Sequence, residues 1–230
     1  MSELVLEGIT VSRGAGPVIS DVSLRVTGGE VLALVGPNGA GKTSLIESVS
    51  GVTAHSAGSM TLDGEPIDKF SRVTRTRRGI VHIEQGRAVF PSLTVRENIS
   101  LTARTPGELE AALAQFPELE KRIDAPTALL SGGEQQMVVL ARAFAAKPRI
   151  LLIDEMSLGL APVVFMRLMP IVKSIADSGV GVLLVEQFTQ LALGLAQEAV
   201  VVAGGRVSFQ GTSADLRADP GLLHRAYLGG

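Results

Sequence analysis

Three glycines, a lysine and a threonine lie close together from Gly36 to Thr43, where the chain reads Gly-Pro-Asn-Gly-Ala-Gly-Lys-Thr. Glycine allows positive φ and lets backbone N–H groups approach an anion with no Cβ in the way. Lys42 would add a positive charge at the β- and γ-phosphates of a nucleotide, and the Thr43 hydroxyl would ligate magnesium. We therefore predict that ATP and Mg²⁺ bind to Gly36, Pro37, Asn38, Gly39, Ala40, Gly41, Lys42, Thr43 and Ser44.

Two neighbouring carboxylates, Asp154 and Glu155, follow a short apolar run farther along the chain. Taken alone, such a pair is more often a solvated turn. Beside a phosphate loop, however, the aspartate can hold magnesium through water, and the adjacent glutamate can polarise a water for attack on the γ-phosphate. We therefore predict that Asp154 is a metal ligand and that Glu155 is catalytic.

Continuously apolar runs surround these groups and are typical of strands buried on both faces, as in a parallel sheet. The phosphate loop lies between one such strand and a helix expected over Lys42 to Ser50, whose positive N-terminal end would point at the phosphates. The acidic pair ends another strand, at the edge of the sheet where ligand sites form. The strands predicted in this way are 31–35, 150–153, 182–185 and 199–202.

The segments outside this core have a different pattern of apolar and polar residues. Leu4 to Val11 alternates apolar and polar residues, and with Val22 to Val26 it predicts a small antiparallel sheet. Residues 86–146 contain helix-forming pieces at 95–101, 107–116 and 133–146 with no continuous apolar strand. A last strand at 206–209 and terminal helices within 213–228 follow the core. The predicted fold class is thus α/β, with a mainly parallel sheet, an N-terminal antiparallel β subdomain and an inserted helical subdomain.

Bulk composition excludes several classes of protein. The formal net charge is −2 and tryptophan is absent, so neither electrostatic attraction nor stacking favours nucleic acid as a partner. The one basic run, Arg72 to Arg78, is interpreted as a solvated helix face, with a local basic patch as the alternative.

The N-terminus lacks a secretory pattern, no apolar run is long enough to span a membrane, and cysteine is absent, so we expect a cytoplasmic protein. His55, His82 and His224 lack metal-ligand spacing and are expected to be structural.

The run Leu130-Ser131-Gly132-Gly133-Glu134-Gln135-Gln136 decides the family. By itself it predicts a helix N-cap at Ser131 with Glu134 completing a capping box. It also resembles the signature motif of ATP-binding-cassette (ABC) ATPases, which follows a phosphate loop and precedes an acidic pair in the same order as here. The resemblance extends over the whole chain, 1–230, and implies an ABC ATPase domain of the P-loop NTPase class. Residues 1–85 and 147–230 would form its nucleotide-binding core, and residues 86–146 its helical signature subdomain.

Within this family the chain is most similar to the ATPase subunits of branched-chain amino-acid importers. The strings that carry this similarity are Glu84 to Phe90, Ser157 to Pro162, Leu184 to Gln187 and Ala226 to Gly230. The resemblance places Gln85 at the position that reaches magnesium or the attacking water and senses a transmembrane partner, with a polar turn residue as the alternative. It also places Val18 among the nucleotide-binding residues.

Three positions depart from the wider family. Arg13 stands where many members stack an aromatic ring on adenine; a guanidinium can stack in its place, and an exposed arginine without a role is equally consistent. Met156 replaces the usual proline after the acidic pair. Gln187 replaces the histidine that contacts the γ-phosphate, and it can donate a hydrogen bond but carries no charge. The branched-chain subfamily shares this glutamine, so Gln187 is kept as a catalytic residue.

The resemblance implies a composite site in which each ATP lies between the phosphate loop of one subunit and Ser131, Gly132 and Gly133 of another. We expect a homodimer or heterodimer, peripheral on the inner face of the membrane, that energises uptake of branched-chain amino acids or a related small polar solute. Its partners would be permease subunits and, indirectly, a solute-binding protein, with a docking groove at Arg87, Phe90 and the helical insertion. A weakly hydrolysing regulatory subunit and a soluble ABC ATPase outside transport remain the alternatives.

Overall fold

The computed structural model describes residues 1–14, 16–86 and 88–229. The strands are β1 (Glu3–Arg13), β2 (Gly16–Thr27), β3 (Val31–Val35), β4 (Ala57–Leu62), β5 (Glu65–Pro66), β6 (Ile80–Ile83), β7 (Ile150–Asp154), β8 (Gly181–Val185), β9 (Glu198–Ala203) and β10 (Arg206–Thr212). The α-helices are α1 (Lys42–Ser50), α2 (Arg72–Arg77), α3 (Val95–Ser100), α4 (Pro106–Gln115), α5 (Gly132–Ala145), α6 (Pro162–Asp177), α7 (Thr189–Leu195), α8 (Ser213–Ala218) and α9 (Pro220–Leu228). Two 3₁₀ helices cover Pro117–Arg122 and Thr127–Leu129.

The larger sheet has the order β10-β9-β3-β8-β7-β6, and its strands run parallel except for β10, which pairs antiparallel with β9. Alternate residues of β3 enter two different cores: Val31, Ala33 and Val35 face one, and Leu32 and Leu34 face the other. The apolar runs are therefore buried on both faces, as predicted, because each side of the sheet is covered.

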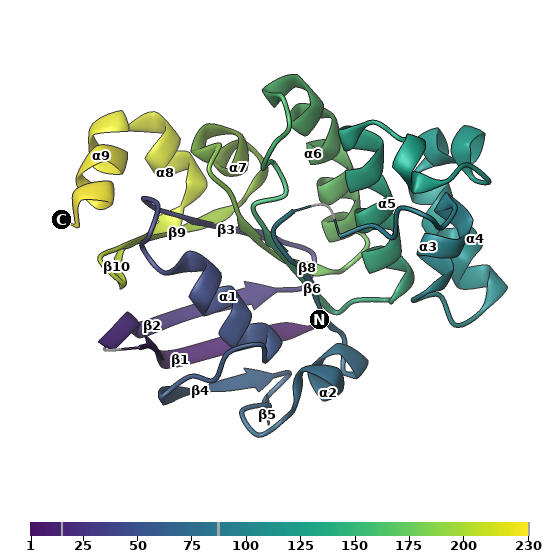
Figure 1. Ribbon diagram of the computed structural model, residues 1–230. Coiled ribbons are helices and arrows are strands. Elements are labelled where there is room, and N and C mark those ends of the chain that lie inside the picture. Colours follow the sequence, from purple (N-terminus) through teal and green to yellow (C-terminus); the bar gives the residue numbers. More distant parts are fainter. Residues whose placement is uncertain (15, 87, 230) are drawn as a thin grey trace.

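The smaller sheet has the order β2-β1-β4-β5 and is antiparallel throughout. Its apolar face shares one core with α1 and the near face of the larger sheet, and α1 lies between the two sheets (Figure 1). The pairing of β1 with β2 confirms the predicted antiparallel sheet. Strands β4 and β5 were not predicted, because Ala57–Leu62 contains glycine and serine and alternates only weakly.

The helical pieces α3, α4 and α5 lie at the opposite end of the molecule from the terminal helices α8 and α9 (Figure 1). Helices α3 and α4 pack on α5, and all three contribute to the core on the far side of the larger sheet. The predicted helical texture of residues 86–146 is thus confirmed, whereas its division from the core as a subdomain stays a prediction. In the part of the chain that the structure describes, none of the helices combines the length and apolarity needed to cross a membrane.

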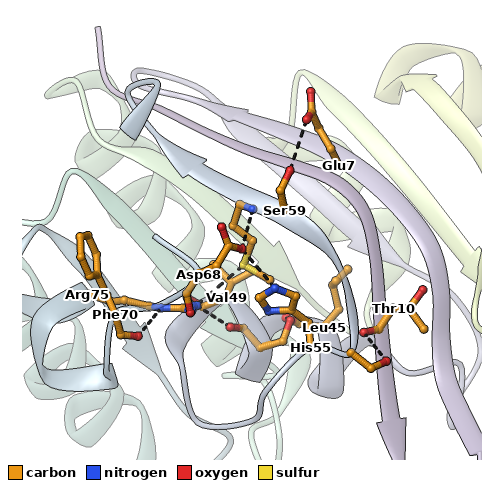
Figure 2. A network of polar contacts seen from close by, with 12 residues as sticks. Glu7, Thr10, Leu45, Val49, His55, Ser59, Asp68, Phe70 and Arg75 are labelled. Atoms are coloured by element: carbon orange, nitrogen blue, oxygen red, sulfur yellow. Dashed lines mark hydrogen bonds and ion pairs between the residues drawn. The ribbon is translucent and has the colours of Figure 1, made fainter. Parts of the chain in front are cut away.

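Helix α2 corrects the prediction that the whole basic run from Arg72 to Arg78 is a solvated face. Arg75 is buried, and its guanidinium donates to the backbone oxygens of Ser48 and Val49, at 2.7 and 2.8 Å, and to those of Asp68 and Phe70 (Figure 2). The last carbonyls of a helix lack partners within the helix. Arg75 therefore caps the C-terminal end of α1, while Arg72, Arg77 and Arg78 stay exposed.

Candidate functional site

The phosphate loop connects β3 to α1, as its sequence predicted. Gly36 and Gly41 have φ of 147° and 97°, and a Cβ at either position would collide with backbone oxygen, of Val202 and Val18 respectively. Helix α1 begins with no side-chain cap and no acidic residue in its first turn. Its first N–H groups are therefore left for an anion, which the helix dipole also favours.

The Lys42 side chain lies across this loop. Its Nζ donates to the backbone oxygens of Gly36, at 2.8 Å, and Pro37, at 3.1 Å, and the residue is buried. Burial lowers the pKa of Lys42, and the nearby carboxylates of Glu155 and Asp154 oppose that shift. The ammonium group is thus held beside the loop, where a bound phosphate would stabilise its charged form.

Two oxygen ligands for a hard cation lie next to this lysine. The Thr43 hydroxyl donates to Oδ1 of Asp154 at 3.4 Å, although the two residues are far apart in sequence. Burial raises the pKa of Asp154 to about 6, against the lowering effect of this hydrogen bond. A buried carboxylate and a hydroxyl that converge in this way fit Mg²⁺, which binds few protein oxygens and keeps water and phosphate as its other ligands.

Glu155 is the point where three strand ends meet. Its Oε2 accepts a hydrogen bond from Nε2 of Gln85, at 2.6 Å, and from Nε2 of Gln187, at 2.9 Å. Gln85 follows β6, Glu155 follows β7 and Gln187 follows β8, and these strands are neighbours in the sheet. Glu155 also has a φ of 46°, a region that non-glycine residues rarely adopt and that clusters at functional sites.

Apart from Gly36 and Asp154, these groups line one cavity of about 370 Å³, which we call the phosphate cavity. Its lining residues are Val18, Asn38, Gly39, Gly41, Lys42, Thr43, Ser44, Gln85, Glu155 and Gln187. Most of the predicted nucleotide-binding and catalytic residues are therefore brought together. Arg13 is not among them: its guanidinium pairs with Glu47 and donates to Thr53. Its role at adenine stays a prediction, for which the geometry adds no support.

The second half of the predicted site is separate. Ser131 caps α5, where its Oγ accepts from the N–H of Glu134 while Glu134 accepts from the N–H of Ser131, so the predicted capping box is present. A cavity of about 510 Å³ lies against this helix start, and we call it the signature cavity. It is lined by Glu118, Ser131, Gly132, Gly133, Glu134, Met137, Gly159, Leu160, Ala161, Val164 and Arg167, none of which lines the phosphate cavity.

A third cavity, of about 220 Å³, lies between β6 and α5 and is lined by Arg72, Val81, His82, Ile83, Glu84, Ala88, Thr102, Val139, Arg142 and Ala143. The Nε2 of His82 and the Nη1 of Arg142 have no hydrogen-bond partner among the described residues. Burial lowers the pKa of His82 to about 4, so this ring is neutral. Beside the cavity, Phe90 is exposed and lies under the Arg142 guanidinium, whereas Arg87 falls outside the described residues.

Glu186 is the functional candidate that the sequence analysis missed. It is fully buried, its Oε1 accepts from the N–H of Ser157 at 3.2 Å, and its Oε2 accepts from the Ser157 hydroxyl. Burial raises the pKa of Glu186 to about 7. The signal that the sequence offers for it is a glutamate directly after an apolar strand, and the family comparison rests on Gln187 beside it.

Comparisons with known proteins show which family this chain resembles. The family model described as ABC transporter matches residues 19–157. BraG of Pseudomonas aeruginosa, a high-affinity branched-chain amino acid transport ATP-binding protein, is 36% identical and covers 99% of this chain and 100% of its own. The probable branched-chain amino acid transport ATP-binding protein LivF of Archaeoglobus fulgidus is 36% identical over 86% of this chain and 87% of its own. The lipopolysaccharide export system ATP-binding protein LptB of Escherichia coli is 32% identical over 100% of this chain and 98% of its own.

A solved structure of a nucleotide-free ATP-binding cassette from an ABC transporter has the same fold, with a TM-score of 0.86 at 22% identity, covering 97% of this chain and 98% of that one. Members of this family bind and hydrolyse ATP, generally with Mg²⁺, and their ATPase subunits dimerise and work with permease subunits. The family model spans more than half of this chain, and the relatives match nearly all of it. The chain therefore belongs to the ABC transporter family, as an ATP-hydrolysing subunit.

Proposed function

We propose that the chain energises an importer for branched-chain amino acids or a related small polar solute, in a complex on the inner face of the cell membrane. The support is the pair of amino-acid transport relatives, which match at 36% identity. The export protein LptB matches at 32%, so an exporter is the second candidate. ATP hydrolysis would occur at the convergence of Gln85 and Gln187 on Glu155, which is the observation that carries the assignment of the site.

In this site Glu155 would take a proton from the attacking water, because its Oε2 is held at the cavity wall by two amide donors. The backbone N–H groups of the loop and the ammonium group of Lys42 would hold the phosphates and stabilise the charge that develops on them. When bound, Mg²⁺ neutralises phosphate charge, and Thr43, Asp154 and Gln85 would be its protein-side partners. Gln187 would donate an amide hydrogen bond at the same place without adding charge.

The permease would dock at the cavity between β6 and α5. The Nη1 of Arg142, which has no hydrogen-bond partner among the described residues, and the exposed ring of Phe90 favour a cytoplasmic helix that carries an acidic residue next to an apolar one. Arg142→Ala and Phe90→Ala are expected to lose co-purification with the permease while ATP binding is kept. Arg104→Ala, at an exposed arginine in the same helical segment, is the control, and loss of binding to the same degree in that variant would contradict this docking site.

The transport assignment is tested by purifying the tagged chain from its own membranes with the permease that accompanies it, and by reconstituting the complex in vesicles. In inverted vesicles this subunit lies on the outer side, so ATP is added outside and the solute is enclosed inside. Import in the cell then corresponds to ATP-dependent movement of the solute out of the vesicles. Labelled leucine, urea and a short amide separate the solute classes. Lipid extraction in place of amino-acid movement would support the exporter, and ATP-independent movement would refute both proposals.

A further inference from the structure

One segment, from Asp154 to Ala161, connects the two halves of the site. At its start, Glu155 lines the phosphate cavity, and at its end Gly159, Leu160 and Ala161 line the signature cavity. Any shift in this segment therefore changes both cavities together. What holds its middle in place decides how accurately Glu155 is positioned.

The middle of the segment is fixed by a buried pair of side chains. Glu186 is fully buried and Ser157 is 4% exposed. Both carboxyl oxygens of Glu186 are used by Ser157, one by its backbone N–H at 3.2 Å and the other by its hydroxyl. A buried carboxyl costs free energy unless its oxygens are hydrogen-bonded, so this contact strongly favours a single placement of Ser157.

The contact of Glu186 with Ser157 lies beside a second contact to the same segment, that of Gln187 with Glu155. Gln187 donates from its side chain to Glu155, while Glu186 accepts from Ser157, so two successive residues after β8 hold two residues of the segment. The backbone of the segment is also held, by the oxygen of Val185, which accepts from the N–H of Glu155 at 2.9 Å, and by Nε2 of Gln136, which donates to the oxygen of Met156 at 3.1 Å. Glu186, which follows β8, thus holds both the backbone and the side chain of the segment at Ser157.

We propose that Glu186 is a positioning residue for ATP hydrolysis, which holds Ser157 and thereby keeps Glu155 and the signature cavity in register. The inference rests on the proposed role of Glu155. Glu186 does not line the phosphate cavity, and the hydrogen bonds of its side chain to the segment both go to Ser157. Its loss therefore lowers turnover and leaves ATP binding to the loop intact.

The test compares variants of the full chain, purified in complex with the permease, in steady-state phosphate release over an ATP titration and in a separate ATP-binding titration. In Ser157→Ala and Glu186→Met, kcat falls about tenfold or more, since small displacements of a catalytic group cost this much, and the ATP dissociation constant stays within about twofold. In Glu186→Gln, kcat stays within about threefold, because the amide can accept from the Ser157 N–H and donate to its hydroxyl.

Two controls separate positioning from general damage. Ser213→Ala removes a hydroxyl that is also buried but has no hydrogen-bond partner among the described residues, and kcat is expected to stay unchanged. The double variant Glu186→Met/Ser157→Ala is expected to be no slower than the slower single variant, because both changes remove one contact. Thermal unfolding of each variant shows whether it is folded, and if Glu186→Met is not, Ser157→Ala and Glu186→Gln decide.

The proposal is overturned if Ser157→Ala and Glu186→Met keep kcat within about twofold of the wild-type chain, or if the two changes multiply in the double variant. An ATP dissociation constant that rises in parallel with the loss of kcat would also overturn it. Normal turnover in Glu155→Gln is a different outcome, since it removes the proposed role of Glu155 itself and not only its positioning.

Discussion

At the scale of single residues, the site depends on the environment of Glu155. Its backbone has a positive φ, and the two glutamine amides that its side chain meets are neutral donors. Neutral donors orient a carboxylate and leave it able to accept a proton from water. The replacement of the family's histidine by Gln187 therefore keeps an orienting hydrogen bond at Glu155.

Glu155→Gln is expected to lower turnover by about 10²- to 10⁴-fold, which is the usual contribution of a general base, and to leave ATP binding near normal. The reason is that glutamine fills the same space but cannot take up the proton. Phosphate release and an ATP titration measure the two effects. Glu198→Gln, at an exposed position, serves as the control, and phosphate release close to the wild-type rate in Glu155→Gln would refute the assignment.

The buried carboxyl of Glu186 makes the stability of the folded chain depend on pH. Its pKa rises from the ordinary 4.5 to about 7, because of burial and, to a smaller extent, the facing charge of Glu155. Between these pH values the folded chain binds a proton that the unfolded chain has released, so the free energy of unfolding falls as pH rises. Above pH 7 this loss of stability is complete and stays constant, and below pH 4.5 there is no loss, because both states are protonated.

Glu186→Gln removes this titration. Urea unfolding at a series of pH values should therefore show a smaller loss of stability in Glu186→Gln than in the wild-type chain as pH rises from 4.5 to 7, by up to about 3 kcal/mol. Thermal unfolding at the same pH values provides an independent check. Parallel pH profiles for the two proteins would show that Glu186 does not titrate in this range.

At the scale of elements, α1 has two ends with opposite needs. Its N-terminus is left without a side-chain cap, facing the cavity, whereas the guanidinium of Arg75 satisfies carbonyls at its C-terminus. A firm cap at the far end compensates for the open end and holds the helix that carries Lys42 and Thr43. Arg75 on α2 is thus a support of the phosphate loop.

Arg75→Ala is expected to lower the free energy of unfolding by about 3 kcal/mol, because buried carbonyls lose charged donors and a cavity forms. Arg77→Ala, an exposed residue of the same helix, is the matched control and should change stability by less than about 0.5 kcal/mol. Urea denaturation measures both. Equal effects in the two variants would contradict the capping role.

The central elements could be predicted from the sequence because burial on both faces leaves a continuous apolar run, as in β3, β7, β8 and β9. Helix α1 was predicted with its observed bounds, since a phosphate loop specifies the helix start. Strands β4 and β5 could not be found, because their register comes from pairing with β1 and not from their own residues. The burial of Arg75 depends likewise on a distant element.

At the scale of the whole molecule, the phosphate cavity and the signature cavity share no lining residue. Each is open in the single chain, and a head-to-tail pair of chains would bring the phosphate loop of one against the signature helix of the other. Two composite sites would then form about a two-fold axis. The isolated monomer is accordingly expected to hydrolyse ATP poorly.

Complementation tests this arrangement. Lys42→Ala and Ser131→Arg should each abolish turnover, because each damages both sites of a homodimer. Mixing the two variants should restore activity to at most about a quarter of the wild-type rate, since about half of the dimers are mixed and each mixed dimer has one intact site. Phosphate release from the mixture is the measurement, and two copies of one variant at the same total concentration are the control. No recovery on mixing would contradict a site shared between identical chains.

The sequence by itself determined the chemical groups of this protein, since the phosphate loop, the signature and the acidic pair are each continuous segments whose spacing encodes their local geometry. The tertiary structure alone decided which groups meet. Gln85, Glu155 and Gln187 converge because β6, β7 and β8 are neighbours that run parallel and end at one edge of the sheet. The contact of Glu186 with Ser157 and that of Arg75 with α1 arise in the same way, because hydrogen bonds between residues far apart in sequence leave no periodic pattern along the chain.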